Sequence, residues 1–406
     1  MKTREGVTRM IRRPDYVNAI LPFVNAPLVK ILSGVRRCGK STILEMMKEE
    51  LLSRGIKAEN IIGRNYASVE YGEDFLAKDM YADLLSAIDG KGRCYLFLDE
   101  LQEIEGWEKV VNTLLESANV DIYVTGSNSK LMSSEISTYL SGRYVSIPVY
   151  TLSLREYMAF KDARDRYSAF ENYLQYGGFP VIGISRFDTR SAYQIVDDIY
   201  TAVVTRDISR RHRIRNKALF DRVMRFIIEN VGKTFSANSI VKLLKGEKRS
   251  LSVETIYNYL KWLQEAFIIY PCQRYDLQGK AVLKTQEKYY LSDISLKYGQ
   301  LGFDNKMIAA MLENIVFLEM KRRGYEVYIG KIGSKEIDFI GILRDEKVYV
   351  QVCRTIPEDS DRETENLKEI RDHYHKYVVA MDKLAIGNDE GIVFVHIADF
   401  LLMDKW

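Results

Sequence analysis

The feature that most constrains this chain is a glycine-rich turn between an apolar strand and an amphipathic helix. Residues 28–32 form a short apolar run of strand length, and residues 41–52 carry apolar side chains at helical spacing. The turn between them fits the pattern G-x-x-x-x-G-K-[ST]. The motif and the next helical residue are Gly34, Val35, Arg36, Arg37, Cys38, Gly39, Lys40, Ser41 and Thr42. A strand, this turn and a helix in succession predict a phosphate-binding P-loop.

The chemistry of a P-loop gives each residue type in this turn a task. Glycines let the backbone wrap phosphates with its N–H groups pointing inward. The amino end of the following helix adds a partial positive charge. We expect Lys40 to reach the β- and γ-phosphates of ATP during catalysis and Ser41 to bind Mg²⁺. The alternative is a glycine-rich turn with a solvated lysine, which the flanking strand and helix disfavour.

Two acidic residues follow a later apolar run. Residues 94–98 are continuously apolar, as expected of a strand buried on both faces, and Asp99 and Glu100 come directly after them. Ligands of an open α/β sheet bind at the carboxyl ends of its strands. We expect Asp99 to bind Mg²⁺ and Glu100 to act as the general base for the attacking water. The alternative is a pair of exposed loop acids, which are common after strands.

Polar residues also follow the strand predicted at residues 121–125. The segment 125–129 reads Thr-Gly-Ser-Asn-Ser, in which Ser127 or Asn128 could contact the γ-phosphate or orient the water. The alternative is a turn that caps a following helix. Arg143 lies further downstream and could act as an arginine finger or internal sensor, or could be an ordinary surface arginine.

Strands and helices alternate through the first 150 residues. Helical patterns at 75–88 and 107–118 separate the strand candidates that begin at residues 61, 94 and 121. Such alternation predicts an α/β fold with a parallel sheet and helices on its faces. Charged residues make up 28% of the chain and hydrophobic residues 47%, the balance of an ordinary globular protein.

These motifs together resemble a family of prokaryotic AAA-type P-loop ATPases with a C-terminal domain of unknown function. The segments that carry the resemblance are 34–42, 96–100, 125–129, 140–143, 173–180 and 206–208. The resemblance covers almost the whole chain. It implies an AAA-type sheet in which the P-loop strand lies between neighbours, with ATP and Mg²⁺ as cofactors. It does not supply a substrate.

Residues 151–216 show helical spacing, and the resemblance implies a lid or connector there. The densest basic run of the chain ends this part: Arg206, Arg210, Arg211, His212, Arg213 and Arg215. It could contact phosphates of DNA, or of ATP in a neighbouring subunit of a homo-oligomer. The alternative is a solvated helix face partnered by Asp197, Asp198 and Asp207.

Residues 217–300 suggest a winged helix. Helical patterns occur at 218–229, 236–244 and 253–264, and apolar runs at 267–270 and 288–291 could be wing strands. The third helix has the polarity of a recognition helix, with Thr255, Tyr257, Asn258 and Lys261 able to reach a groove. Lys245, Lys248 and Arg249 precede it. The alternative is a helical domain that packs against subunits or a protein partner.

Residues 301–406 return to mixed α/β and resemble the restriction-endonuclease-like fold. That fold's metal site uses a helix Glu, an Asp and an E-x-K motif on the next strand. Glu313 or Glu319 could supply the first and Asp338 the second, but Gln351 and Cys353 replace the last two. An amide and a thiol suit a hard Mg²⁺ ion poorly, so we expect no active nuclease.

Whole-chain features narrow the function classes. The net charge of +3 gives no argument for nucleic acid by itself, so any basic surface must be local. Four scattered cysteines and the charged amino terminus favour a reduced, cytoplasmic location, and no apolar run is long enough to span a membrane. We expect an ATP-driven switch or motor that acts on DNA or a protein partner. The alternative is an ATP-regulated DNA nuclease with a divergent metal site.

Overall fold

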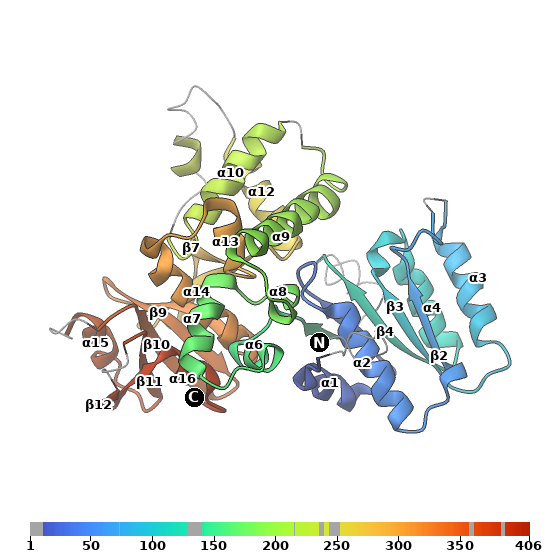
Figure 1. The fold of residues 1–406 in the computed structure, drawn as a ribbon, viewed down its shortest axis with the longest axis horizontal. Coiled ribbons are helices and arrows are strands. Elements are labelled where there is room, and N and C mark those ends of the chain that lie inside the picture. Colours follow the sequence, from blue (N-terminus) through green and yellow to red (C-terminus); the bar gives the residue numbers. More distant parts are fainter. Residues whose placement is uncertain are drawn as a thin grey trace. The chain divides into compact units, whose positions relative to one another are not determined.

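The computed structural model describes residues 11–72, 74–128, 140, 142–214, 216–234, 239–242, 252–356, 361–382 and 386–406. The chain divides into two compact units (Figure 1). The first comprises residues 1–149 with the short segment 265–267, and the second comprises residues 150–264 and 268–406. None of the helices among the described residues is long and apolar enough to cross a membrane.

The first unit is built on a parallel sheet. Its described strands are β1 (Val29–Ser33), β2 (Ile61–Asn65), β3 (Cys94–Asp99), β4 (Val120–Gly126) and β5 (Tyr144–Pro148). They lie in the order β2-β3-β4-β1-β5, and every described pairing is parallel. The expected parallel sheet, with the P-loop strand between neighbours, is therefore confirmed. Strand β5 was not predicted, because this partly exposed edge strand lacks a long apolar run.

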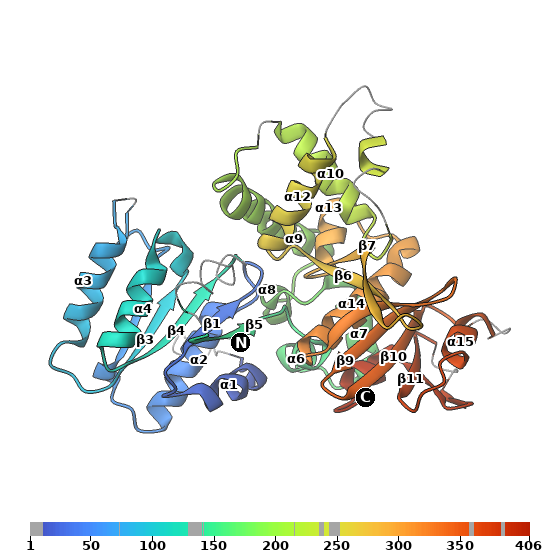
Figure 2. The ribbon, with the colours of Figure 1, turned by 180° about the vertical axis from the view of Figure 1, so that it is seen from behind.

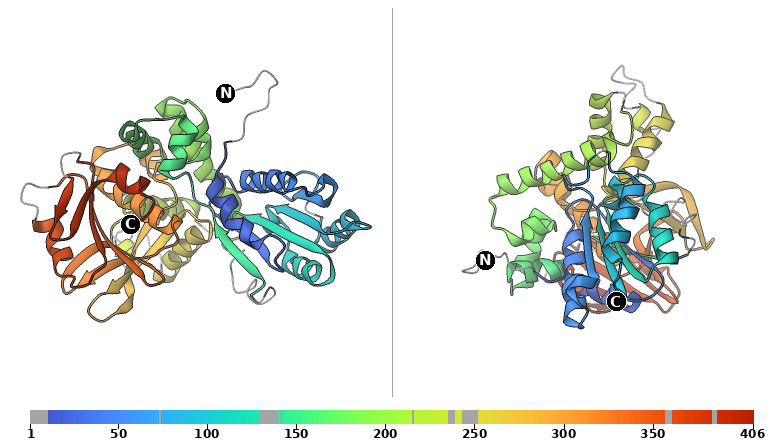
Figure 3. Two further views of the ribbon diagram at one scale, coloured as in Figure 1. Left: turned by 90° about the horizontal axis from the view of Figure 1, so that it is seen from below. Right: turned by 90° about the vertical axis from the view of Figure 1, so that its right-hand side faces the viewer.

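Helices cover both faces of this sheet. They are α1 (Pro14–Ile20), α2 (Lys40–Ser53), α3 (Ala77–Ile88) and α4 (Trp107–Ser117). Met80 of α3 and Leu114 of α4 join the core cluster formed by alternate strand residues such as Ile31 and Leu96. Lys48 of α2 lies over the ring of Phe97, which points to the other face. Figure 3 shows α1 and α2 on the opposite side of the strands from α3 and α4.

A buried ion pair joins two neighbouring strands on the α2 side. Lys30 of β1 contacts the carboxylate of Asp121 on β4, and both side chains are fully buried. The second oxygen of Asp121 accepts the hydroxyl of Tyr123 at 2.7 Å and the N–H of Asn25 at 2.9 Å. Burial lowers the pKa of Lys30, and the Asp121 charge opposes that shift. These hydrogen bonds offset part of the desolvation cost that a buried pair incurs.

The second unit contains a mixed sheet. Its described strands are β6 (Ile269–Asp276), β7 (Ala281–Leu291), β8 (Glu326–Ile332), β9 (Lys335–Leu343), β10 (Glu346–Cys353), β11 (His375–Ala380), β12 (Gly387–Asp389) and β13 (Ile392–His396). They lie in the order β12-β13-β11-β10-β9-β8-β6-β7. Strands β8, β9 and β10 form an antiparallel meander, and β11 runs parallel to β10.

The strands expected as wing strands are the edge of this same sheet. Strands β6 and β7 pair with each other, and β6 pairs in parallel with β8 over Arg274–Asp276. Tyr290 of β7 stacks on Phe317 at 4.5 Å and packs on Phe339, so the apolar side chains of this hairpin complete the sheet's own core. The two strands suggested as wing strands thus belong to the carboxyl-terminal sheet, which crosses the domain boundary predicted at residue 300.

Helices surround this sheet and extend beyond it (Figure 2). They are α6 (Leu154–Lys161), α7 (Arg166–Tyr176), α8 (Pro180–Ile184), α9 (Thr189–Ala202), α10 (Lys217–Glu229), α12 (Val253–Glu265), α13 (Ser295–Leu301), α14 (Ile308–Arg322), α15 (Asp361–Lys368) and α16 (Ile397–Leu402). Helix α9 continues into a π-helix at Val203–Ser209. Of the helix expected at 236–244, residues 239–242 are helical. Arg215, Lys245, Lys248 and Arg249 lie outside the described residues.

Candidate active site

The P-loop motif forms a tight turn between β1 and α2. At Gly34, a Cβ atom would lie 2.1 Å from the carbonyl oxygen of Val149, so no larger residue fits there. Gly39 precedes the first residue of α2 with φ of 105°, which a residue with a side chain rarely adopts. Both glycines are therefore required by the backbone path itself. The 14-residue helix α2 begins directly after the turn, so its amino end lies beside the turn.

The Lys40 ammonium lies within this turn. Its side chain is buried, and Nζ donates hydrogen bonds to the carbonyl oxygens of Gly34 at 2.9 Å and Val35 at 3.1 Å. A buried ammonium at the amino end of a helix concentrates positive charge where a phosphate chain could lie. The contact of Lys40 with ATP phosphates stays a prediction.

The other P-loop residues divide into exposed and buried ones. Ser41 and Thr42 open α2 and are exposed, as is Arg37, which has φ of 68°. Val35 and Cys38 are buried, and Arg36 is half-buried. The hydroxyl of Ser41 is thus accessible to a ligand, whereas the Cys38 side chain fills space beneath the turn.

Arg13 supports the turn from the amino-terminal helix. It immediately precedes α1, is 2% exposed, and donates from Nη1 to the carbonyl oxygen of Cys38 at 2.8 Å. Its guanidinium also lies 4.5 Å from the centre of the Tyr16 ring. Arg13 was not among the residues predicted for the site. An isolated arginine far from the motif gives no signal of its own, because the contact depends on how α1 packs.

Asp99 and Glu100 lie at the carboxyl end of β3 and share a partner on β4. The hydroxyl of Thr125 donates to Oδ1 of Asp99 and accepts the backbone N–H of Glu100 at 3.0 Å. The strand register pairs Leu98 with Val124, so Thr125 comes opposite Asp99. Thr125 was part of the segment singled out in the sequence, but its role depends on β3 and β4 being neighbours.

Glu100 has two features expected of a positioned acid. Its backbone has φ of 52°, a conformation that is uncommon for residues with a side chain. Its carboxylate accepts a hydrogen bond from Nε2 of Gln102, which also lies 3.5 Å from Oγ of Ser127. Gln102 therefore links the end of β3 to the end of β4. Gln102 was not predicted as a site residue, because a single glutamine after two acids forms no recognisable motif.

The sheet order brings most of the predicted site to one edge. Ser127 and Asn128 are buried just beyond β4, and β4 lies between β1 and β3. Gly126 is opposite Ser33, the last residue before the P-loop. The P-loop, the two acids and Asn128 therefore share the carboxyl edge of the sheet, where such folds bind ligands.

Arg143 does not share that edge. It precedes β5, and its carbonyl oxygen accepts the N–H of Val29, the first residue of β1. Because β1 and β5 are parallel, Arg143 lies at the amino edge of the sheet, opposite the P-loop. Its guanidinium contacts Glu116, and both side chains are about half exposed. The expected role as an internal sensor is inconsistent with this position.

Few donor atoms are available for a divalent cation at the carboxyl edge, and they are oxygens, which are hard ligands. No group of three or more His, Cys, Asp or Glu residues suited to a metal occurs in the described ranges. The carboxyl edge offers the hydroxyl of Ser41 and the carboxylate of Asp99. Oxygen donors suit Mg²⁺, which usually takes only one or two protein ligands beside substrate phosphates and water. These residues therefore fit the Mg²⁺ that a P-loop implies.

A second charged cluster lies in the other unit. Lys288 of β7 is buried, with Nζ 2.8 Å from Oε1 of Glu336 and 3.6 Å from Oε2 of Glu313. Asp338 is near enough that burial and the Glu313 charge raise its pKa to about 8. Of the two glutamates left open by the sequence, Glu313 is the one beside this cluster. Glu319 instead pairs with Arg322 and Arg323.

Gln351 and Asp338 contact each other across β9 and β10. The N–H of Asp338 donates to Oε1 of Gln351 at 3.3 Å, and Oδ2 of Asp338 accepts the N–H of Val352 at 2.8 Å. Cys353, the residue in place of the E-x-K lysine, is buried in the core on the α15 side. The cluster thus contains carboxylates, the Gln351 amide and the Lys288 ammonium. Lys288 comes from β7, a strand that was not predicted to lie beside these acids.

Comparison with known proteins gives two adjacent domains. Residues 26–158 match the family described as an AAA domain, and residues 167–307 match a domain of unknown function. A Haemophilus influenzae protein described as uncharacterized is 38% identical over 398 residues, covering 97% of this chain and 99% of that protein. An uncharacterized protein of Methanocaldococcus jannaschii is 29% identical, covering 91% of this chain and 85% of its own length.

A solved structure is similar to this fold. The structure of a Walker-type ATPase from Pyrococcus abyssi has a TM-score of 0.50 and 15% sequence identity, covering 74% of this chain and 97% of its own. At that identity the similarity concerns the fold alone. With the AAA match, it agrees with the parallel sheet and P-loop of the first unit.

Proposed function

Since this chain belongs to the same protein family as its Haemophilus influenzae relative and carries an AAA domain, we propose that it is a Mg²⁺-dependent ATPase. One observation carries the proposal: the P-loop with Lys40 and the acids Asp99 and Glu100 meet at the carboxyl edge of one parallel sheet. The fold alone does not define an activity, so the proposal depends on these side chains.

The site residues would divide the reaction among them. Lys40 and the amino end of α2 would bind the β- and γ-phosphates, and the glycine turn would exclude side chains from that path. Ser41 and Asp99 would hold Mg²⁺, which when bound neutralises charge on the phosphate oxygens. Glu100 would accept a proton from the water that attacks the γ-phosphorus. The bond from that phosphorus to the bridging oxygen breaks, and ADP leaves.

Thr125, Gln102 and Asn128 would act as positioning residues. Thr125 contacts Asp99 and the backbone of Glu100, and Gln102 contacts the Glu100 carboxylate. Asn128 is buried at the end of β4, where a side-chain amide could contact the γ-phosphate or the water. Arg143 would serve only a neighbouring subunit, as an arginine finger in a homo-oligomer, because it belongs to the other edge of its own sheet.

A phosphate-release assay on the full chain tests this proposal. Lys40→Ala should abolish tight ATP binding, because the buried ammonium is lost. Glu100→Gln should retain binding while turnover falls by about 10²-fold or more, the scale of a general base. Glu103→Gln is the matched control, since Glu103 is exposed three residues further on. Equal turnover in Glu100→Gln and Glu103→Gln would remove Glu100 from the mechanism.

We further propose that DNA is a partner, contacted through the arginine run and α12. Arg206, Arg210 and Arg213 are exposed and form no ion pair with a described residue. His212 stacks on Trp262 of α12 at 4.4 Å, which fixes the run beside that helix. Unpaired arginines are the groups that gain most from neighbouring phosphates.

Helix α12 has the burial pattern of a recognition helix. Ile256, Leu260 and Leu263 are buried, whereas Tyr257 and Asn258 on the same helix are exposed. Lys261 is exposed as well. Thr255 is half-buried and hydrogen-bonded to Ser252, which caps the helix, so it is the weakest of the four predicted contacts. A protein partner on the same surface is the alternative, because such helices also serve as protein-binding modules.

The carboxyl-terminal sheet supports a restriction-endonuclease-like fold without nuclease activity. The order α14-β8-β9-β10-α15-β11, with an antiparallel meander followed by a parallel strand, agrees with that fold. The Lys288 ammonium beside Glu313 and Glu336 argues against a divalent cation there. We therefore propose that this part contributes binding surface and no nuclease chemistry.

A further inference from the structure

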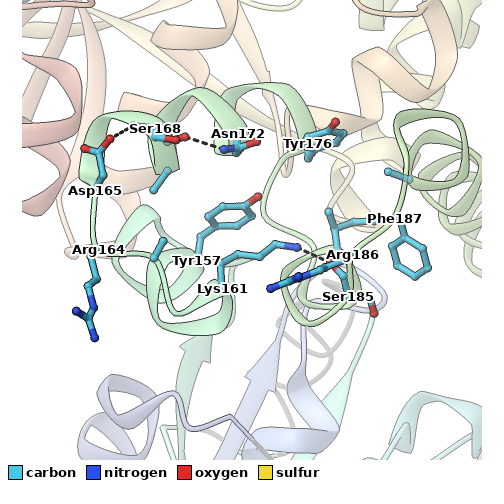
Figure 4. A pocket seen from close by; sticks show the side chains of 14 residues that line it. Tyr157, Lys161, Arg164, Asp165, Ser168, Asn172, Tyr176, Ser185, Arg186 and Phe187 are labelled. Carbon is cyan, nitrogen blue, oxygen red and sulfur yellow. Dashed lines mark hydrogen bonds between the residues drawn. The ribbon is translucent and has the colours of Figure 1, made fainter. Parts of the chain in front are cut away.

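A cavity of the second unit opens among its amino-terminal helices (Figure 4). It has a volume of about 500 Å³, within the range of small-molecule sites. The residues that matter for its chemistry are Tyr157 and Lys161 from α6, Asp165 before α7, Tyr176 from α7, and Arg186 and Phe187 before α9. All of them belong to this unit, so the cavity is separate from the P-loop.

The cavity carries an excess of positive charge. Lys161 and Arg186 both line it, and neither forms an ion pair with a described residue. Burial and the charge of Arg186 lower the pKa of Lys161. Asp165 is the one acidic residue in the lining, and its two oxygens accept the N–H groups of Tyr167 and Ser168 at 3.1 and 3.3 Å. Its carboxylate therefore caps α7, and it forms no ion pair with either cation within the described part of the chain.

Tyr157 adds a hydroxyl to the cavity wall. The residue is 2% exposed, and its hydroxyl makes no hydrogen bond with the described part of the chain. Figure 4 shows this side chain beside Lys161 within the cavity. Burial raises the pKa of Tyr157 to about 12, so the hydroxyl keeps its proton and can donate it in a hydrogen bond. The ring is held by an edge contact with Tyr173 at 5.4 Å.

Aromatic side chains supply an apolar wall. Phe187 lines the cavity and is 38% exposed, so its ring is accessible to a ligand. Tyr176 lies at the same opening, and its hydroxyl hydrogen-bonds with Thr189 of α9 at 3.0 Å, which holds the ring in place. An aromatic face beside two cations suits a ligand with a planar ring and an anionic group.

We propose that this cavity binds a phosphorylated compound with a planar ring, the chemistry of a mononucleotide. Lys161 and Arg186 pair with the phosphate oxygens, and the hydroxyl of Tyr157 donates to one of them. The ring packs against Phe187 and Tyr176. The volume suffices for one such molecule, and the site is independent of the proposed ATPase function.

Titration calorimetry on the full chain with Lys40→Ala tests this site apart from the P-loop. The probes are AMP, pyrophosphate and adenosine. AMP should bind, and the added pair Lys161→Met and Arg186→Met should weaken it at least about tenfold, the loss expected of charge-assisted hydrogen bonds. Arg190→Met, an exposed arginine of α9, is the matched control. Thermal unfolding of each variant separates loss of the site from loss of the fold.

The three probes show which part of the ligand, the phosphate or the ring, the cavity recognises. Phe187→Ala should weaken AMP and leave pyrophosphate unchanged, and adenosine should bind far more weakly than AMP. Equal affinities for AMP and pyrophosphate would overturn the ring assignment. Absence of AMP and pyrophosphate binding at millimolar concentration, or AMP binding unaffected by the double substitution, would overturn the site. Any residual binding at the P-loop appears as the portion that the double substitution does not remove.

Discussion

The hydroxyl of Thr125 on β4 donates a hydrogen bond to the carboxylate of Asp99 at the end of β3. The same hydroxyl oxygen accepts the backbone N–H of Glu100 at 3.0 Å. One side chain thus holds the residue proposed to bind Mg²⁺ and the residue proposed to activate water. Glu100 is in an uncommon backbone conformation, with φ of 52°, so its orientation depends on such contacts.

Thr125→Val should therefore lower ATP turnover more than ATP binding. Valine keeps the shape of threonine but removes both hydrogen bonds, and misplacement of catalytic groups costs on the order of 10- to 100-fold in rate. Thr125→Ser retains the hydroxyl and should stay within a few-fold of the parent. Single-turnover kinetics and fluorescent-nucleotide binding separate the two effects. Similar turnover in the valine and serine variants would show that these hydrogen bonds do not position the acids.

DNA binding through the arginine run should depend steeply on salt. Replacing Arg210, Arg211 and Arg213 together by glutamine should weaken anisotropy-detected binding at low salt. It should also reduce the slope of log K against log salt by roughly 2 to 3, about 0.9 for each lost phosphate contact. A nitrogen of Arg211 is buried and has no hydrogen-bond partner among the described residues, so thermal unfolding should accompany the binding curves.

The matched control for that experiment uses arginines already neutralised by acids. Arg155 and Arg166 pair with Asp404 and Asp399 at 2.8 and 2.7 Å in the same unit. Their joint replacement by glutamine should leave the salt dependence unchanged. No binding of any DNA by the parent chain at low salt would exclude DNA as a partner of this surface.

Local patterns in the sequence predicted the parts of the site that are contiguous. The P-loop and the acids after β3 follow from residues close together in the chain. Thr125 and Gln102 could not be assigned, because their partners are known only once β4 is placed beside β3. Arg13 contacts the P-loop only through the packing of α1. Arg143 could have been an arginine finger, an internal sensor or a surface arginine, and only the parallel direction of β5 shows that it lies at the edge away from the P-loop.

The same limit explains the errors in the second unit. Individual helices such as α10 and α12 follow their apolar spacing, so they were predicted within a few residues. The partners of strands β6 and β7 were not, because nothing local shows that β6 pairs with β8. The pairing of β6 with β8 also brings Lys288 of the neighbouring strand β7 to the acidic cluster. Strand order is a property of the whole chain, which one sequence without its fold does not reveal.

A buried lysine should make stability depend on alkaline pH. Lys297 of α13 is 3% exposed and donates to the carbonyl oxygen of Glu229 at the end of α10, at 3.0 Å. Burial and the charge of Lys233 lower its pKa to about 8. Between pH 8 and the ordinary lysine pKa of 10.5, the unfolded chain keeps a proton that the folded chain has released. The free energy of unfolding should therefore rise with pH in that window.

Chemical denaturation of the parent and Lys297→Met at pH 7 to 10 measures this effect. Other groups titrate in the same range, so the quantity to follow is the difference between the two proteins. The parent should gain stability relative to the variant as pH rises above about 8. A constant difference across the range would show that Lys297 titrates normally.

The carboxyl-terminal cluster should bind no catalytic metal and cut no DNA. The Lys288 ammonium lies 2.8 Å from Glu336, where it competes with a divalent cation for carboxylate oxygens. Burial and the charge of Glu313 raise the pKa of Asp338, which favours its protonated form, a poorer metal ligand. Gln351 adds no charge, and two-metal hydrolysis needs several carboxylates. We expect no cleavage of duplex, single-stranded or branched DNA with Mg²⁺, Mn²⁺ and ATP.

Asp338→Ala and the exposed-turn control Asp345→Ala should therefore behave alike in that cleavage assay. Cleavage that disappears in Asp338→Ala and persists in Asp345→Ala would mean that the cluster is an active nuclease site.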